Sequence, residues 1–416
     1  MGNAWVICLL FFQVGVWPGV PQQSFIEQSL VINVEVPVRV FKGATFIDDL
    51  TIDDFEILED GIPQKIEACY LVNKKMIQRR EEKKKYMPET SRHFYLFFEI
   101  TDYIPKIEEA VEHFCQNVLI PGDNLVVVTP VKTYRLKDLA LQAKTRGEIA
   151  KELNGLVRKD CQDGNAQFRD IVSNLTEVAK SLSASLMSGG STTAVEVLEL
   201  SGTSPSTLYG MSLEEKLVFY GTLLGKLDTL RAISQMKMLD FANQLSREDG
   251  QKVVFLFYQR EYIPQVEPEI VLQHSALFQE NPYIYQAITG VPKMREREMN
   301  VDVERVKRAY ADASTAIHFL FITTPRPDVP GVYFEERSED IFNAFREIVR
   351  ATGGYFESSS NPAAMFRSAL EAAENYYLLY YSPSTIGDPD RNFRNIVVRV
   401  KRGDFRVLHR TGYFLR

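Results

Sequence analysis

The first residues of this sequence that could do chemistry follow an apolar run in the segment HFYLFFEITDYIP, residues 93–105. The run ends at Glu99, and Thr101, Asp102 and Tyr103 come directly after it. A carboxylate with neighbouring hydroxyls could bind a hard cation such as Mg²⁺ or take part in general acid–base catalysis. The structural alternative is that a buried strand ends here in polar residues.

Other catalytic or metal-binding patterns find little support in the sequence. The five histidines show no His-x-x-x-His spacing and no paired cysteines accompany them, which argues against a zinc site. There is no Gly-x-Ser-x-Gly elbow and no Walker or Rossmann glycine pattern. The pairs Asp48/Asp49 and Asp53/Asp54 lie in turn-like segments, where solvated carboxylates are expected. A hydrolase that uses these acidic turns stays an alternative without a motif, and we expect no enzymatic activity and no cofactor.

The composition favours a globular protein that does not bind polyanions. With 416 residues, 45% of them hydrophobic, the chain can form one large or two moderate domains. Its net charge of -7 opposes attraction to nucleic acid or to an anionic membrane. We therefore expect no nucleic-acid partner.

Residues 1–23 are typical of a secretory signal peptide. An apolar run over residues 4–16 is followed by Trp17, Pro18 and a polar continuation. This length suits a secretory signal better than a membrane span. A buried N-terminal strand or a non-cleaved anchor is the alternative, because no Lys or Arg precedes the run. We expect an exported protein, which is periplasmic, secreted or on the cell surface, with no membrane span once the leader is removed.

Residues 25–72 are predicted to form a small antiparallel β unit. From Ile32 to Val40 apolar and polar residues alternate, which is the period of a half-buried strand. Two further apolar runs flank the turn at residues 59–61. Residues 73–92 carry charges of both signs and are predicted to be a solvated linker.

Residues 93–383 alternate short apolar runs with helical stretches. The predicted strands are residues 94–99, 125–129, 253–258, 317–322 and 355–357. Apolar strands between helices indicate a parallel sheet that is covered on both faces. The predicted class is therefore α/β. Residues 384–416 return to a hairpin pattern, which we expect to pack on the N-terminal β unit.

A series of ordered motifs runs along the chain. They are LTIDDFEILEDGIPQKI, RHFYLFFEITD, LIPGDNLVVV, GQKVVFLFY, TGGYFE and the tail YYLLYYSPS, FRNIVVRVKRG and RTGYF. Over residues 28–414 this order resembles the VWFA-related domain family described from acidobacteria. The resemblance implies a von Willebrand factor type A fold, with a doubly wound, mostly parallel, Rossmann-like sheet in an exported bacterial protein. The N-terminal and C-terminal strands would add an antiparallel β unit.

The family resemblance also implies a metal ion-dependent adhesion site at the carboxyl end of the sheet. Its Asp-x-Ser-x-Ser motif falls on Glu99, Thr101 and Tyr103, and a rigid phenol cannot bring its oxygen to the second serine's position. The loop threonine of the family falls on Thr192 or Thr193 in the segment GGSTT.

The last implied ligand, an Asp after the fourth strand, falls on Gln259, and Arg260 follows it. Because ligand quality is lost and a positive charge is gained, we predict a degenerate site without metal, in which Glu99 is a remnant or a partner for Arg260. A metal-dependent adhesion domain that retains weak Mg²⁺ binding through Glu99 and Thr101 is the alternative.

The long stretch 262–300 is predicted to belong to the binding surface. It contains Tyr283 and Tyr285, and it follows the strand that ends at Gln259. Long connections often carry function, and exposed tyrosines favour binding surfaces. The sequence therefore predicts a non-enzymatic, adhesion-like interaction module that reads a protein ligand through aromatic and charged contacts.

Overall fold

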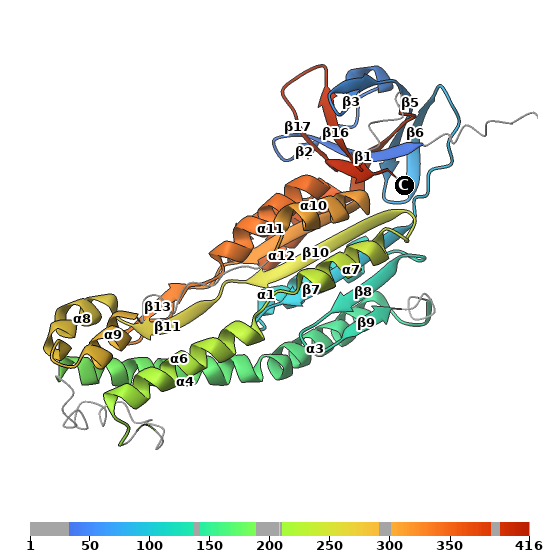
Figure 1. The fold of residues 1–416 in the computed structure, drawn as a ribbon. Coiled ribbons are helices and arrows are strands. Elements are labelled where there is room, and N and C mark those ends of the chain that lie inside the picture. The colour runs from blue at the N-terminus through green and yellow to red at the C-terminus, as the bar shows by residue number, and fades with distance from the viewer. Residues whose placement is uncertain are drawn as a thin grey trace, which may run out of the picture. The chain divides into compact units, whose positions relative to one another are not determined.

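A computed structural model of the chain describes residues 33–136, 142–188, 208, 210–290, 301–383 and 392–415 (Figure 1). All of them belong to one compact unit, residues 33–416. The predicted signal peptide, residues 1–23, lies outside the described residues.

A six-stranded sheet, which we call the central sheet, positions the candidate site. Its strands in spatial order are β14 (Phe356–Ser359), β12 (Thr315–Ile322), β10 (Gln251–Gln259), β7 (Arg92–Glu99), β8 (Asn124–Val128) and β9 (Thr133–Leu136). Neighbouring strands pair in parallel from β14 to β8, whereas β8 and β9 pair antiparallel. All eight residues of β12 are buried, as expected for an apolar strand covered on both faces.

Helices cover both faces of the central sheet. One face packs against α1 (Pro105–His113), the π-helical turn Phe114–Val118, α3 (Arg146–Gly164) and α12 (Pro362–Glu374). The other packs against α7 (Gln235–Leu245), α10 (Val303–Asp312) and α11 (Glu339–Thr352). Alternate residues of β7 enter the two cores, with Leu96 in the first and Tyr95 in the second.

The N-terminal and C-terminal segments form two antiparallel sheets. Sheet A contains β17 (Arg406–His409), β1 (Val34–Lys42), β15 (Asn375–Tyr381), β5 (Ile66–Asn73) and β6 (Met76–Glu82), with β2 (Thr45–Phe46) added to β1. Sheet B contains β18 (Gly412–Phe414), β16 (Phe393–Val400), β3 (Phe55–Glu59) and β4 (Ile62–Gln64), and the 3-10 turn Ile52–Asp54 precedes β3. Strands more than 300 residues apart thus pair directly.

A helical unit with its own core follows α3. It consists of α4 (Ala166–Met187), α6 (Leu213–Leu230), α8 (Pro268–His274), the 3-10 turn Ser275–Phe278, α9 (Pro282–Gly290) and the two-stranded sheet of β11 (Tyr262–Val266) and β13 (Val332–Glu336). The two long helices α4 and α6 pack on each other, and α4 also packs on β11.

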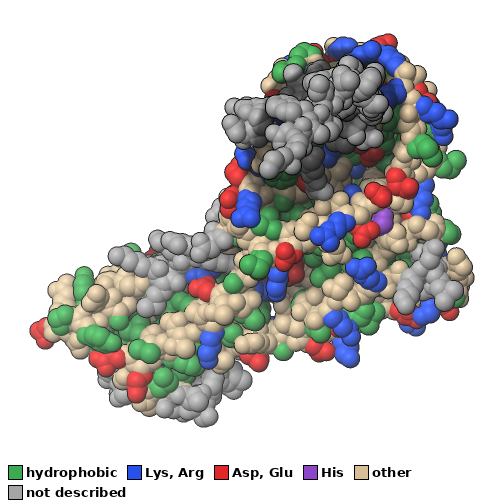
Figure 2. Space-filling model, turned by 45° about the vertical axis from the view of Figure 1, so that its right-hand side comes forward, with side chains coloured by type: hydrophobic (Ala, Val, Ile, Leu, Met, Phe, Trp, Pro, Cys, Tyr) green, Lys and Arg blue, Asp and Glu red, His purple; other side chains and the backbone are tan. Residues whose placement is uncertain are grey.

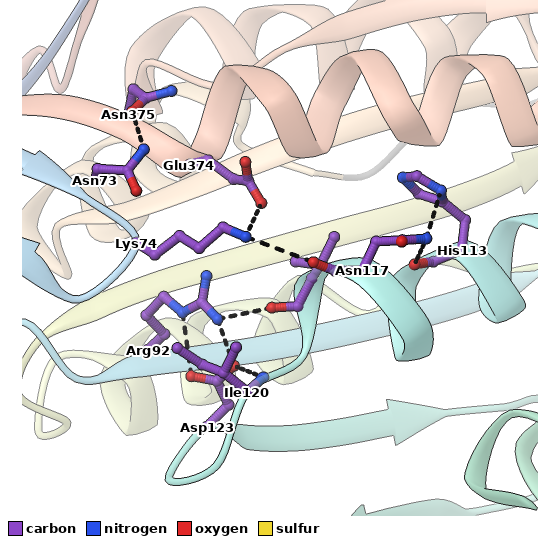
Figure 3. Close-up of polar contacts among 10 residues, drawn as sticks. Asn73, Lys74, Arg92, His113, Asn117, Ile120, Asp123, Glu374 and Asn375 are labelled. Atoms are coloured by element: carbon purple, nitrogen blue, oxygen red, sulfur yellow. Dashed lines mark hydrogen bonds and ion pairs between the residues drawn. The ribbon is translucent and has the colours of Figure 1, made fainter. Parts of the chain in front are cut away.

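Polar contacts join the β5–β6 turn of sheet A to the helical segments that cover the central sheet (Figure 3). Lys74 lies in the turn between β5 and β6. Its Nζ atom is 3.4 Å from Oε1 of Glu374 and 3.5 Å from the carbonyl oxygen of Asn117. Beside it, the fully buried guanidinium of Arg92 donates two hydrogen bonds to Asp123, over 3.1 and 2.5 Å. These contacts hold the start of β7 in place.

The predicted fold class, a doubly wound, mostly parallel sheet of von Willebrand A or Rossmann-like type, is wrong. The described strands form four sheets, and sheet A, as large as the central sheet, is antiparallel throughout. The central sheet is itself mixed, because the short connection from β8 to β9 closes an antiparallel hairpin.

Two segments that the sequence analysis treated as connections contain regular structure. The expected linker 73–92 contains β6, an edge strand whose residues alternate between exposed and partly buried. Charged side chains on such an edge oppose pairing with another chain. The stretch 262–300 contains β11, α8 and α9 within its described part. Among the described residues, no helix combines the length and the apolar character that a membrane crossing requires.

Candidate functional site at the carboxyl edge of the central sheet

The candidate site lies where the adjacent parallel strands β7 and β10 end. Tyr258 pairs with Glu99, so the next residue of β10, Gln259, stands beside the loop that follows β7. Every residue of β10 after Gln251 is buried, and Gln259 is 3% exposed. A polar side chain at this depth must find hydrogen-bond partners within the protein.

Gln259 finds those partners in the loop after β7. Its side-chain oxygen Oε1 accepts hydrogen bonds from the backbone N–H of Thr101 (2.9 Å) and of Asp102 (2.9 Å). It also accepts a hydrogen bond from the hydroxyl of Thr101 over 3.1 Å. One neutral amide oxygen therefore receives three donors and fixes the loop without a charge.

The junction between α3 and α4 holds the same loop from the other side. Asn165 is 2% exposed, and its amide donates to the carbonyl oxygens of Ile100 and Cys161, each over 2.8 Å. The guanidinium of Arg169 donates to the carbonyl oxygen of Thr101 over 3.3 Å and to that of Gln162. The backbone of the loop is thus clamped by neutral and cationic donors.

Tyr103 is turned away from Gln259 toward α3. Its hydroxyl donates to Oδ1 of Asn154 over 3.1 Å, and the guanidinium of Arg158 lies 5.8 Å from the centre of its ring. Burial raises the pKa of the Tyr103 phenol above its ordinary range. The residue therefore acts as a neutral hydrogen-bond donor that fastens the loop to α3.

Glu99 faces a different space from Thr101. It lines an apolar cavity of about 480 Å³ on the α7 side of the central sheet, together with Phe97, Phe241 and Tyr258. Burial raises the pKa of the Glu99 carboxyl, and the nearby Arg231 opposes that shift. Desolvation disfavours the charged carboxylate in such surroundings.

Arg260 pairs with Glu336 of β13, with 3.1 Å between Nε and Oε1. Its guanidinium also lies over the ring of Phe321, 5.5 Å from the ring centre. The sequence suggested Glu99 as the partner of Arg260. The guanidinium of Arg260 instead joins the connection between β10 and β11 to β13.

An open polar cleft of about 270 Å³ lies at this edge. Its lining consists of Thr101, Asp102, Tyr103, Arg158, Gln162 and Arg169. Asp102, Arg158 and Gln162 are exposed, and neither arginine forms an ion pair with a carboxylate among the described residues. The cleft therefore offers two guanidiniums and one carboxylate to a ligand from solvent.

The residues at this edge do not fit the divalent metal that the family resemblance implies. Gln259 Oε1 is already saturated by three donors of the chain, and the Tyr103 hydroxyl is committed to Asn154. Glu99 and Thr101 line separate spaces. Mg²⁺ requires several oxygen atoms that converge at about 2.1 Å from one point, and this arrangement does not provide them.

Of the remaining predicted site residues, the two that the structure describes lie elsewhere, on α9. Thr192 and Thr193 lie outside the described residues. Tyr283 and Tyr285 lie on α9 of the helical unit, where they are 68% and 38% exposed. Leu272 and Leu277, on the preceding turns, are 77% and 60% exposed. Figure 2 shows hydrophobic side chains on the surface of this part of the molecule, at its left.

Sequence reasoning missed Asn154, Asn165, Arg158 and Arg169, the α3 and α4 residues that surround the loop. Asn165 carried a signal, since asparagine between two helical stretches favours a break and bonds nearby backbone groups. The arginines carried none, because charged residues on a helix usually face solvent. No protein-family model, no curated protein and no solved structure matches this chain.

Proposed function

We propose that this protein is a non-enzymatic protein–protein interaction module that binds its protein ligand at the carboxyl edge of the central sheet without a metal ion. The observation that carries the proposal is the polar cleft with Arg158 and Arg169 beside the loop that Gln259 closes. An acidic side chain of the ligand would enter this cleft.

The chemistry of the cleft supports an acidic ligand segment. A guanidinium binds a carboxylate through two parallel N–H donors, which gives both affinity and orientation. Arg158 is exposed on α3, and Arg169 is already oriented by the carbonyl oxygens of Thr101 and Gln162. Asp102 lines the same cleft, so the preferred segment carries a hydrogen-bond donor or a cation next to its acidic residue.

The aromatic surface of α9 supports a second contact with the ligand. Tyr283 and Tyr285 are exposed together with Leu272 and Leu277, and aromatic residues are enriched where proteins bind one another. This surface lies on α8, the following 3-10 turn and α9, whereas the cleft lies where α3 meets α4. A ligand that contacts both must therefore be an extended protein rather than a small molecule.

An exported, adhesion-like role is the part of the proposal that rests on sequence. The apolar leader at residues 4–16 and the resemblance to the VWFA-related family support export to the periplasm, the medium or the cell surface. The net charge of -7 is consistent with a protein partner rather than a nucleic acid.

The proposal is tested by photo-crosslinking in the native host. A photoreactive amino acid placed at Gln162, which lines the cleft, is expected to trap a protein ligand. Arg158→Glu should reduce the yield of this adduct at least tenfold, because the new carboxylate would repel the acidic side chain of the ligand. Lys159→Glu is the matched control, since this exposed neighbour on α3 changes the charge equally outside the cleft.

Three results would contradict the proposal. One is an adduct yield at Gln162 that Arg158→Glu leaves unchanged. Another is the same adduct trapped from Met87, which is 94% exposed and lies on a different part of the chain. The third is loss of the adduct on addition of a chelator, which would show that the ligand is held through a metal.

A further inference from the structure

Arg39, in the middle of β1, is a buried cation without a counter-charge. The residue is 2% exposed, and in the described part of the chain its side chain forms no ion pair and no hydrogen bond. Its guanidinium lies 5.8 Å from the centre of the Tyr376 ring. Burial lowers the pKa of Arg39 to about 10, in the direction expected when a charged group loses water and gains no partner.

Arg92 shows how this chain accommodates a buried guanidinium elsewhere. It is equally buried, at 2% exposed. Its side chain donates two hydrogen bonds to Asp123 and a third to the carbonyl oxygen of Val118 (2.9 Å), and Figure 3 shows the pairing with Asp123. Buried charges are normally paired in this way. Arg39 therefore differs from Arg92, because no carboxylate pairs with it in the described part of the chain.

A second guanidinium lies close to Arg39. Arg410 is 9% exposed and donates to the carbonyl oxygens of Glu35 (2.5 Å) and Asp312 (3.4 Å). Its Nε atom is buried without a hydrogen-bond partner, as is Nε of Arg39. Lys252, 6% exposed, adds a third cation and donates to the carbonyl oxygen of Glu248 over 2.6 Å.

These three cations line one small cavity between sheet A and the central sheet. Its walls come from β1, β15, β10 and β12, and its volume is about 20 Å³. Glu35 is the one carboxylate in the described lining, and it accepts a hydrogen bond from the Tyr380 hydroxyl. Burial disfavours both charged forms, since it raises the pKa of Glu35 and lowers that of Lys252, so the excess of positive charge rests mainly on the two arginines. The cavity is therefore electropositive.

We propose that this cavity binds one monatomic anion, chloride under physiological conditions, between Arg39, Arg410 and Lys252. A space of this size accommodates about one water-sized particle, which is too small for phosphate, sulfate or an organic carboxylate. A halide ion accepts hydrogen bonds from any direction. It can therefore pair with the unpartnered N–H groups of both guanidiniums without a particular orientation. The anion supplies the counter-charge that Arg39 lacks.

The bound anion would join two parts of the fold. Arg39 and Tyr376 belong to sheet A, whereas Lys252 and Thr315 belong to β10 and β12 of the central sheet. A ligand that binds the folded state alone stabilises it in proportion to the logarithm of its concentration. The packing of sheet A on the central sheet should therefore depend on chloride.

The test is thermal unfolding of the full chain in sodium chloride and in sodium gluconate at equal ionic strength. Gluconate is too large for the cavity, so the pair of salts separates specific binding from screening. We expect the transition midpoint to be higher by about 2 °C or more in about 0.15 M chloride. Arg39→Met should abolish the difference, and Arg399→Met, which changes an exposed arginine of β16, should keep it.

A second measurement covers the case in which Arg39→Met fails to fold. Crystals of the unchanged protein soaked in bromide should show an anomalous peak within hydrogen-bond distance of Arg39 Nε and Arg410 Nε. Equal midpoints in chloride and gluconate, or a cavity that holds water without an anomalous peak, would overturn the proposal.

Discussion

At the scale of single residues, the neutral amide of Gln259 decides the chemistry of the site. A carboxylate beside the loop after β7 would need a cation to balance its charge. The amide oxygen of Gln259 instead satisfies the N–H groups of Thr101 and Asp102 and the Thr101 hydroxyl. The backbone of the loop is thus held without an ion.

Replacing this acceptor should be costly. Gln259→Leu leaves the buried donors of Thr101 and Asp102 without partners, and we expect the free energy of unfolding to fall by about 2–3 kcal/mol. Chemical denaturation measures the change. Gln167→Leu, at an exposed position of α4, is the control and should change it by less than about 0.5 kcal/mol. Equal effects of the two substitutions would show that the three hydrogen bonds contribute nothing specific.

At the scale of elements, the exit from α11 into β14 depends on two glycines. Gly353 ends α11 with a left-handed φ of 67°, a conformation that glycine adopts without strain. A Cβ atom at Gly354 would lie 1.7 Å from the carbonyl oxygen of Ile317 on β12. The backbone of β12 therefore approaches Gly354 more closely than any other residue type allows.

Gly354→Ala is predicted to disrupt this edge of the central sheet. The clash with the Ile317 backbone cannot be relieved by a side-chain rotation, so we expect a loss of at least about 3 kcal/mol in the free energy of unfolding. Gly155→Ala makes the same chemical change within α3, where a Cβ atom meets nothing within 4 Å. It should stabilise the protein by about 0.5–1 kcal/mol. Urea denaturation of both variants measures these opposite changes in the free energy of unfolding. A Gly354→Ala protein as stable as the unchanged protein would contradict the close approach of β12 to Gly354.

Individual elements were easier to predict from sequence than their arrangement. The strand expected at residues 94–99 is confirmed as β7, and that at residues 317–322 lies within β12, because uninterrupted apolar runs define both. The class of fold failed because the central sheet is mixed and because sheet A, which is antiparallel, is equally large. Pairing between N-terminal and C-terminal strands was expected, but the insertion of β15 between β1 and β5 was not. No local pattern encodes that insertion.

For the candidate site, the sequence could predict which residues lie at strand ends but not how their side chains are arranged. Glu99, Thr101 and Gln259 could be placed at strand ends from the apolar runs that precede them. The sequence could not predict that Glu99 lines the apolar cavity while Thr101 lines the cleft. The loop after Ile100 does not continue the alternation of the strand, so the period of two no longer applies there. Arg158 and Arg169 reach the site through the packing of α3 and α4, which depends on tertiary contacts.

At the scale of the whole molecule, residues from both ends of the chain are locked together by buried polar contacts. The Glu59 carboxylate is 5% exposed and accepts the hydroxyls of Tyr381 (2.6 Å) and Tyr413 (3.0 Å). The Tyr377 hydroxyl donates to Ile47 and accepts from Leu50. Sheet A and sheet B are each completed by the C-terminal strands, so the described unit should unfold cooperatively.

The central claim of our proposal is that the carboxyl edge of the central sheet binds its ligand without a metal ion. Titration calorimetry of the purified protein with Mg²⁺, Ca²⁺ and Mn²⁺ tests that claim most directly. We predict no saturable binding tighter than about 1 mM, because the oxygen ligands do not converge. Saturable binding tighter than that, abolished by Glu99→Ala, would contradict the account.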